Sequence, residues 1–368
     1  MPTFLHTADL HLDTAFSANL STEQAVLRRG EMLRSFSDMI DRAKSVDILL
    51  IAGDMFESSY TSRETVSFLK RRFSEIPDTR IFICCGNHDP YTASSVYATE
   101  EFSDNVHIFK GEWECVEIPE IKTRVFGASF SKDRDNLTDR FTGIEKEEGI
   151  TDIILLHGDV VSDNTESSYN PISKSFIENC KADYLALGHI HKRTEVLRLG
   201  RTYYAYPGLP EGRGFDECGD MGYYIGVINE GVADVKFERS CKRRMFRLSI
   251  DISGAADSFE ALDKIKEAVF DKGNENDMYR IYLGGRVSKD SISFDVIEKE
   301  IKGMLYYVEL INNTKENYDI EAFASQNNLC GEFVRRMKDV IENADAEEGS
   351  VSEDALILGI EVLTGGDC

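Results

Sequence analysis

The chain has 368 residues, of which 42% are hydrophobic and 29% charged, and this composition excludes a disordered chain. Its 42 basic and 66 acidic residues give a formal net charge of −24, whereas nucleic-acid-binding domains usually carry the opposite sign. No apolar run approaches the roughly 18 residues that a membrane helix needs. The first residues lack the basic region and apolar stretch of a signal peptide, so neither membrane insertion nor secretion is expected.

The eight cysteines are scattered along the chain and include no Cys-x-x-Cys pair. This distribution favours free thiols, and free thiols favour a reducing cytoplasm over an oxidising compartment. A structural zinc site built from cysteines is not expected.

Residues 1–241 alternate short apolar runs with amphipathic stretches, a pattern typical of a layered α/β domain. Five apolar runs are too short for buried helices and are predicted to be strands, at residues 3–8, 47–52, 80–85, 152–156 and 183–187. A helix is expected to begin near Thr61, because Thr61 and Glu64 have the spacing of a capping box. Three later runs are predicted to form a strand meander, at residues 203–206, 223–227 and 232–237.

A basic cluster at Lys242, Arg243 and Arg244 marks the start of a second domain, predicted over residues 242–315. Its pattern predicts a strand, a helix, a strand, a helix and a strand, at residues 246–252, 258–270, 278–283, 292–301 and 305–311. Residues 316–368 are predicted to be an acidic helical C-terminal segment, with helices at roughly 320–343 and 352–363.

Each of the five strands predicted first is followed by residue types that bind metal ions. The groups are Asp9-Leu10-His11, Gly53-Asp54, Gly86-Asn87-His88-Asp89, His157-Gly158-Asp159 and Gly188-His189-Ile190-His191. Ligands of open α/β sheets bind beyond the carboxyl ends of the strands, so these groups are expected to converge. Side chains two apart on an extended chain point the same way, which predicts that Asp9 and His11 face one site, as do His189 and His191.

The inventory of these side chains predicts the class of metal. It offers four imidazoles, two carboxylates and one amide oxygen, with no thiolate, from Asp9, His11, Asp54, Asn87, His157, His189 and His191. Such a set suits Mn, Fe, Zn or Co rather than Ca. Seven ligands exceed one tetrahedral zinc but suit two ions about 4 Å apart that share a carboxylate, and Asp54 is the natural bridge.

A single histidine at a strand end is more often an ordinary polar residue, but five of the seven histidines fall inside these motifs. The other two, His6 and His107, are expected to be ordinary strand residues. Asp13, Asp89 and Asp159 either orient the histidines or lie on the surface, and the sequence leaves both readings open.

The motifs Asp-x-His, Gly-Asp, Gly-Asn-His-Asp, His-Gly and Gly-His-x-His, in this order over residues 1–240, resemble those of the calcineurin-like metallophosphoesterase superfamily. The resemblance implies an α/β fold, a four-layer sandwich of two mixed sheets flanked by helices. It also implies two divalent ions, with Mn²⁺ preferred and Fe or Zn as alternatives. One ion would bind Asp9, His11, Asp54 and His191, and the other Asp54, Asn87, His157 and His189. His88 would face the substrate as a transition-state stabiliser or general acid.

Within the superfamily, residues 7–13, 188–192 and 206–217 are similar to the DNA repair exonuclease group, which contains SbcD- and YhaO-like nuclease subunits. The small second domain fits the capping domain of that group, whereas residues 316–368 correspond only weakly. The resemblance implies a metal-dependent DNA exonuclease or endonuclease that acts in DNA repair. It also implies a large coiled-coil ATPase subunit as partner, and it leaves a homodimer open.

Two basic clusters, Lys192 with Arg193 and Lys242 with Arg243 and Arg244, are candidate contacts for DNA phosphates. They are equally well read as solvated surface. The acidic balance favours a rival function, a phosphoesterase for cyclic nucleotides or phosphomonoesters. A second rival is a non-catalytic scaffold subunit, which the complete ligand set disfavours.

Overall fold

The computed structural model describes residues 1–14, 16, 19–57, 61–132, 134–162, 169–288 and 291–365. The chain divides into two compact units, one formed by Met1–Arg247 with Asn276–Met278 and the other by Leu248–Glu275 with Tyr279–Cys368. The division places residues 242–247 with the first unit and both the small domain and the C-terminal helices in the second. The predicted boundaries at 241 and 315 stay predictions.

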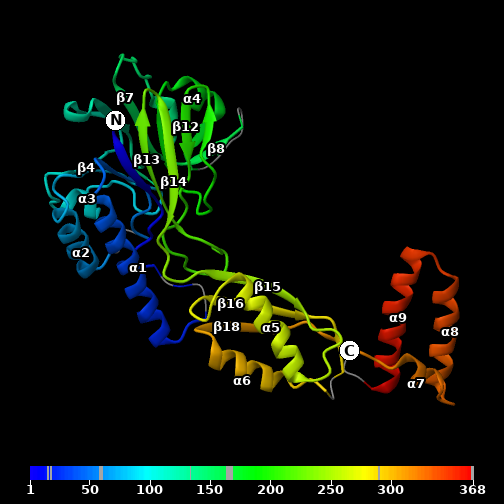
Figure 1. Ribbon diagram of the computed structural model, residues 1–368. Helices are drawn as coiled ribbons and strands as arrows, with labels where there is room; N and C mark the ends of the chain where they lie inside the picture. Colours follow the sequence, from blue (N-terminus) through cyan, green and yellow to red (C-terminus); the bar gives the residue numbers. More distant parts are fainter. Residues whose placement is uncertain are drawn as a thin grey trace. The chain divides into compact units, whose positions relative to one another are not determined.

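Two six-stranded mixed sheets form the first unit (Figure 1). The first sheet has the spatial order β14 (Val232–Arg239), β13 (Gly222–Asn229), β1 (Thr3–Thr7), β2 (Ile48–Ala52), β3 (Arg80–Cys84) and β4 (Val106–Ile108). Strands β1 to β4 are parallel, and β13 runs antiparallel to β1.

The second sheet has the order β11 (Leu197–Leu199), β12 (Thr202–Ala205), β10 (Tyr184–Gly188), β7 (Thr151–His157), β6 (Thr123–Gly127) and β5 (Glu114–Ile118). Its four central strands are parallel. A short parallel pair, β8 (Asp159–Val161) with β9 (Pro171–Ser173), and two 3-10 turns, Pro119–Ile121 and Thr138–Arg140, complete the strands and turns of this region.

Alternation along the strands explains how the layers pack. Phe4, Ile48 and Leu50 point inward, where they meet Ile153 and Leu155 of the second sheet. Their neighbours along the strands point outward and are covered by helices, as the period of two requires. The predicted α/β fold of two mixed sheets flanked by helices is confirmed.

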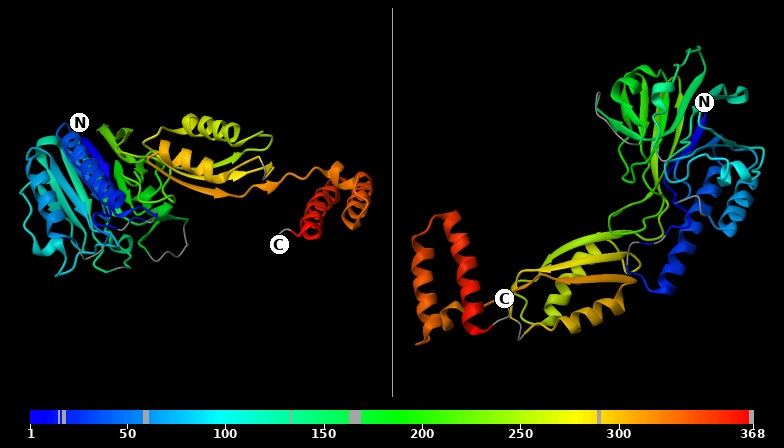
Figure 2. Two further views of the ribbon diagram at one scale, coloured as in Figure 1. Left: turned by 90° about the horizontal axis from the view of Figure 1, so that it is seen from below. Right: turned by 180° about the vertical axis from the view of Figure 1, so that it is seen from behind.

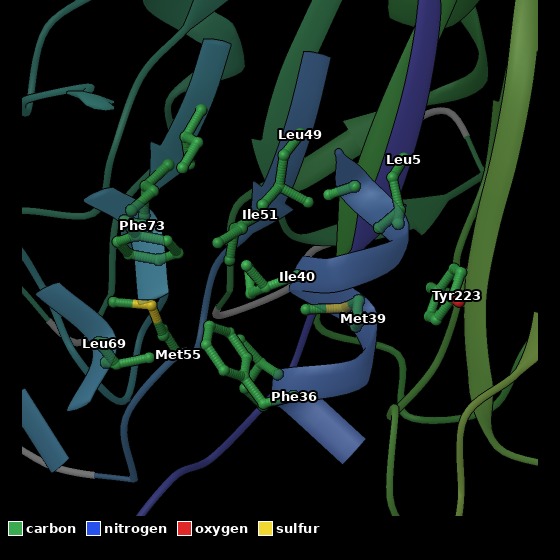
Figure 3. Close-up of a cluster of buried hydrophobic side chains, with 14 of the residues drawn as sticks. Leu5, Phe36, Met39, Ile40, Leu49, Ile51, Met55, Leu69, Phe73 and Tyr223 are labelled. Carbon is green, nitrogen blue, oxygen red and sulfur yellow. The ribbon is translucent and has the colours of Figure 1, made fainter. Parts of the chain in front are cut away.

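The outer face of the first sheet is covered by α1 (Thr22–Ala43) and α2 (Arg63–Ser74). Figure 3 shows Phe36, Met39 and Ile40 of α1 packed against Leu49 and Ile51 of the sheet. On the second sheet, Ile177 of α4 (Lys174–Asn179) packs in the outer cluster, and α3 (Val96–Thr99) is a single turn after β3.

Two sequence expectations need correction in this unit. Helix α2 is capped by Ser62, whose side chain accepts from Thr65 N–H, so the cap lies one residue after Thr61. The predicted meander is wrong, because β12 belongs to the second sheet whereas β13 and β14 form a hairpin in the first. Residues 206–217 therefore connect one sheet to the other.

The second unit contains a three-stranded sheet with the order β15 (Met245–Asp251, which begins in the first unit), β16 (Met278–Gly284) and β18 (Tyr307–Asn312). Helices α5 (Ser258–Lys272) and α6 (Phe294–Met304) connect these strands, as the sequence pattern predicts. A two-stranded ladder joins β17 (Arg286–Val287) to β19 (Lys315–Glu316).

The C-terminal residues form α7 (Ile320–Ala324), α8 (Leu329–Asn343) and α9 (Ala346–Thr364). The predicted helix over 320–343 is therefore broken, and Asn328 caps the new helix by accepting from Gly331 N–H. Helices α8 and α9 lie side by side (Figure 2), and Leu356 and Ile360 pack against Cys330 and Val334. No helix of the described residues is long and apolar enough to cross a membrane.

The seven cysteines within the described residues are free, and Cys368 lies outside them.

The packing of α9 on α8 predicts which apolar side chain stabilises the helix pair. Ile360 is fully buried, whereas Leu358 is 55% exposed. Ile360→Ala is expected to destabilise the pair by about 2–5 kcal/mol through loss of buried methyl groups and the remaining cavity. Leu358→Ala is the matched control and is expected to change stability by about 0.5 kcal/mol or less. Hydrogen exchange of the α8 amides measures both, and equal protection in the two variants would contradict the packing.

Candidate metal centre

The carboxyl ends of β1, β2, β3, β7 and β10 meet between the two sheets of the first unit. Gly188 at the end of β10 lies so close to β2 that an added Cβ would be 1.7 Å from the Ala52 carbonyl oxygen. Glycine is required there because any side chain would separate the sheets. The residues that follow the five strands are thus brought into one cluster, as the sequence predicts.

The local backbone differs from the extended chain expected at Asp9 and His11. Asp9, His11 and Asp54 have φ angles of 53°, 42° and 48°, and His189 has 104°. Left-handed backbone at residues with a Cβ costs roughly 1–3 kcal/mol each and persists where surrounding structure imposes it. Backbone bonds from Asp9 N to Gly53 O and from His11 N to Asp54 O hold these turns.

His11 and His191 form the first facing pair, with their Nε2 atoms 3.1 Å apart. The opposite ring nitrogens face carboxylates, His11 Nδ1 at 2.9 Å from Glu57 Oε2 and His191 Nδ1 at 3.1 Å from Glu217 Oε1. A carboxylate only accepts, so Glu217 keeps the proton on His191 Nδ1 and leaves a lone pair on its Nε2. Glu57 favours the same tautomer of His11 by its charge, although this contact lacks regular hydrogen-bond geometry. Asp9 completes this group of potential ligands.

His157 and His189 form the second facing pair. His157 Nδ1 donates to the Ala52 carbonyl at 3.0 Å, and its Nε2 lies 3.2 Å from His189 Nδ1. Asn87 Oδ1 lies 3.0 Å from the first of these nitrogens and 3.1 Å from the second. Two lone pairs and an amide oxygen therefore point at one another here too.

Asp54 lies between the two pairs. Its Oδ2 is 3.3 Å from His157 Nε2 and 3.8 Å from His11 Nε2, whereas its Oδ1 accepts the His88 backbone N–H at 3.0 Å. Asp54 Oδ2 therefore faces a ring nitrogen in each half of the site.

Burial and neighbouring charges shift the pKa values of several groups in the cluster. Burial opposes charge on His157, but the Asp54 and Asp9 carboxylates outweigh it and raise the pKa of His157 to about 9. Burial and the nearby His157 lower the pKa of His189 to about 4. Burial by itself would raise the pKa of Asp54, but His157 and His11 outweigh it and lower that pKa. Carboxylates and lone pairs together thus attract positive charge.

These residues fit divalent ions. Around an ion with metal–nitrogen distances of about 2.1 Å, neighbouring nitrogens lie about 3.0–3.4 Å apart. The facing pairs at 3.1 and 3.2 Å match this separation. Asp9, His11 and His191 are grouped with their ligand atoms within 4.8 Å of one another, and so are Asp54, His157 and His189.

Three carboxylates that the sequence left open have different roles. Asp159 Oδ1 lies 3.3 Å from His189 Nε2 and directs Nδ1 of that ring toward the site. Asp89 is buried and accepts from the backbone of Gly86 and Phe56, so it orders the loops around the site. Burial and the Asp54 charge raise the pKa of Asp89 to about 7. Asp13 accepts from Ser62 N–H and Thr65 Oγ1 at the start of α2.

Sequence reasoning missed Glu57, Arg213 and Glu217. Glu57 lies three residues after Asp54, and no pattern distinguishes it from other surface acids. Arg213 and Glu217 belong to residues 206–217, where their spacing of four was the available signal. Glu217 contacts His191 Nδ1 directly, and Arg213 Nη2 lies 3.3 Å from the same nitrogen.

His88 lies at the rim of the cluster. Its side chain is 42% exposed, and its Nδ1 is 3.3 Å from the Glu57 carbonyl oxygen. His6 is buried between Tyr184 and the Leu187 carbonyl, and His107 pairs with Glu114 on the far sheet edge. Neither His6 nor His107 is grouped with the cluster.

The candidate phosphate contacts differ in their surroundings. Lys192 and Arg193 are exposed immediately after His191, and the Arg193 guanidinium stacks 4.3 Å from the Phe237 ring centroid. The second basic cluster is paired with acids, and its members bind as Lys242 to Asp38, Arg243 to Glu31 at 2.8 Å, and Arg244 to Asp277 at 2.8 Å. Because each of these cations is already paired with an acid, the cluster has little net charge left to attract phosphate.

One protein family and two known proteins are similar to this chain. The profile of the calcineurin-like phosphoesterase family matches residues 2–193. The chain is 29% identical over 287 residues to an uncharacterized metallophosphoesterase, YhaO, of Bacillus subtilis (strain 168), a match that covers 73% of this chain and 68% of that protein. Among solved structures, a purple acid phosphatase (PPD1) from yellow lupin seeds aligns with a TM-score of 0.41 and 11% identity over 65% of this chain. The aligned part of this chain spans about half, 51%, of the lupin chain.

The position of Asp54 predicts how the site loses its ions. Protein freed of metal and then loaded with Mn²⁺ is expected to bind about two ions per chain. Asp54→Ala is expected to lose both, because its Oδ2 faces both histidine pairs, whereas Asp9→Ala mainly weakens one. Metal analysis after gel filtration measures the number of ions. A single ion that survives Asp54→Ala would sink the two-ion interpretation.

Proposed function

We propose that this chain, which belongs to the calcineurin-like phosphoesterase family, is a metal-dependent phosphodiesterase whose substrate is DNA. The hydrolase part of the proposal rests on one observation. Two pairs of histidines, each with its ring nitrogens facing, lie on either side of Asp54 Oδ2. Two bound divalent ions there supply charge that offsets the phosphate anion and lower the pKa of water. Mn²⁺ is the proposed metal, because oxygen and imidazole ligands together suit it.

The protein's own groups then position the phosphate and move the proton. The facing histidine pairs and Asp54 would fix where a phosphodiester lies, because the cations that they hold would attract its anionic oxygens. His88 stands beside this point, exposed to substrate, with Nδ1 engaged by Glu57. Because Glu57 holds the Nδ1 proton, Nε2 carries a second proton only when the ring is an imidazolium, and in that form His88 would donate the Nε2 proton to the leaving oxygen.

DNA is proposed as substrate on the resemblance of residues 7–13, 188–192 and 206–217 to DNA repair exonucleases. Lys192 and Arg193 support it, because exposed cations directly follow the ligand His191. A small diester or phosphomonoester is the second candidate. The pairing of Lys242, Arg243 and Arg244 with acids favours it, because an extended anionic strand gains little there.

His88 provides a test that separates a proton donor from a metal ligand. His88→Ala is expected to keep both ions and to lose at least about tenfold in the rate of diester hydrolysis. His107→Ala is the matched control, because His107 is remote from the cluster and pairs with Glu114. Rates on an aryl phosphodiester and metal content are measured on the same samples. Loss of metal together with activity would show instead that His88, which also lies near His11 and Glu57, is a ligand.

Salt dependence distinguishes DNA from a small substrate. Each phosphate contact by Lys or Arg adds about 0.9 to the slope of log K against log salt on duplex DNA. Replacing Lys192 and Arg193 together by Ala is therefore expected to flatten the slope by up to about 1.8. Lys242→Ala is the control and is expected to change it little, because Asp38 already neutralises this amine.

DNA binding and cleavage are measured as a function of salt concentration for the unaltered chain and both variants. Hydrolysis of an aryl phosphodiester is measured on the same proteins. Hydrolysis of the aryl diester, which contacts only the ions and His88, should be unchanged in these variants. Rapid aryl diester hydrolysis without any DNA turnover would favour the small-substrate function and contradict the DNA proposal.

A large coiled-coil ATPase subunit is the partner that we propose for the C-terminal helices. Support comes from the apolar side chains that α9 leaves exposed, Leu358 and Val362 at 55% each, while Leu356 and Ile360 pack on α8. Docking onto such an apolar helix face is a common mode of recognition. A homodimer and a cytoplasmic location stay predictions.

A further inference from the structure

Residues 206–217 are built to approach the His191 segment closely. Gly208 has a φ of 72°, and an added Cβ would lie 2.6 Å from the His191 carbonyl oxygen and 2.9 Å from Arg193 N. Leu209 N–H donates to that same carbonyl. Only glycine combines this backbone conformation with this approach.

A buried ion pair anchors the middle of the same segment to α1. Arg28, fully buried, donates to Glu211 at 2.8 Å and to Glu31 at 2.6 Å. The other Glu211 oxygen accepts from Ser35 Oγ at 2.7 Å. Anchored at both points, the segment brings Arg213 and Glu217 to the metal ligands in one defined position.

Arg213 joins the carboxylates behind the two histidines of the first pair. Its Nη1 lies 3.0 Å from Glu57 Oε2, the oxygen that faces His11 Nδ1, and its Nη2 lies 2.8 Å from Glu217 Oε1, the oxygen that faces His191 Nδ1. Arg213 Nη2 is also 3.3 Å from His191 Nδ1, but Glu217 is the only acceptor of the two and therefore holds the ring proton. The guanidinium is 15% exposed and is neutralised by two carboxylates.

Within the described part of the chain, the second pair has no guanidinium that joins the groups behind its two rings. His157 is oriented by a neutral backbone carbonyl, and His189 by Asp159, whose side chain is 26% exposed. The two halves of the site therefore share Asp54 but differ in the charge of the groups behind their imidazoles.

We propose that Glu57, Arg213 and Glu217 form a clamp that makes the His11–His191 half the tighter of the two metal positions. The proposal rests on the two-ion site of the proposed function. Carboxylates behind metal-bound imidazoles fix the ring and raise its basicity, and their loss costs about 10–100-fold in metal affinity. Arg213 is a positioning residue, since it acts through the two carboxylates.

The experiment titrates Mn²⁺ into the metal-free full-length chain and counts bound ions by electron paramagnetic resonance. The unaltered chain is expected to bind two ions with unequal affinities. Glu217→Ala is expected to weaken the tighter ion by about 10–100-fold and to leave the weaker ion unchanged. Glu217→Gln, which keeps an acceptor oxygen for His191 Nδ1, is expected to recover part of the loss.

Asp159→Ala is the matched control in the other half, and it is expected to weaken only the weaker ion. A double-mutant cycle assigns the position: in a His191→Ala background, Glu217→Ala should have no further effect, because it acts through that ring. Thermal melting of each metal-free variant shows whether the fold is kept. Arg213→Gln gives the same test with Glu217 in place, and it is expected to weaken the tighter ion as well.

Equal weakening of both ions by Glu217→Ala, or no weakening in any folded clamp variant, would overturn the clamp. If Arg213→Gln raises KM for an aryl phosphodiester at unchanged Mn²⁺ affinity, Arg213 binds substrate phosphate and the clamp is wrong. A chain that binds two unequal ions as described but hydrolyses no phosphoester would contradict the proposed function alone.

Discussion

Four imidazole lone pairs directed at one another from two sheets are the constraint on which the rest of this structure depends. At separations of 3.1 and 3.2 Å, and with Asp9 and Asp54 buried beside them, the nitrogens repel one another unless positive charge lies between them. The raised pKa of His157 has the same cause, because a proton on this ring supplies positive charge between the facing groups. A divalent ion supplies more positive charge than a proton, and metal binding then releases the proton from His157.

Holding such a cluster together requires structure around it. The left-handed backbone at Asp9, His11 and Asp54 is unfavourable by itself and is imposed by bonds between the β1 and β2 loops. The apolar layer between the sheets, with Phe4, Leu50 and Leu155 at its core, supplies the free energy that keeps the two sheet ends in contact.

Many of the charged side chains near the site are paired with one another or with histidine rings. Part of the acidic surplus near the site has a local function, since Glu57, Glu217 and Asp159 each face a histidine ring. Several cations that looked available in sequence are in turn neutralised by acids, as Arg243 is by Glu31. Substrate affinity in this family member is therefore expected to come mainly from the metal centre and from a few exposed cations such as Lys192.

The sequence by itself determined the fold class, the five strands and the residues gathered at their ends, because apolar periodicity and the clustering of histidine, aspartate and asparagine are local patterns. It could not decide that β12 lies in the other sheet from β13, since strand pairing depends on contacts far apart in the chain. Nor could it assign Glu57, Arg213 and Glu217 to the site, because a single charged residue has no local pattern that reveals which partner folding will bring within about 3 Å of it. The tertiary structure alone decided which charges are paired and which stay exposed, since electrostatic energy depends on distance in space and on burial rather than on position along the chain.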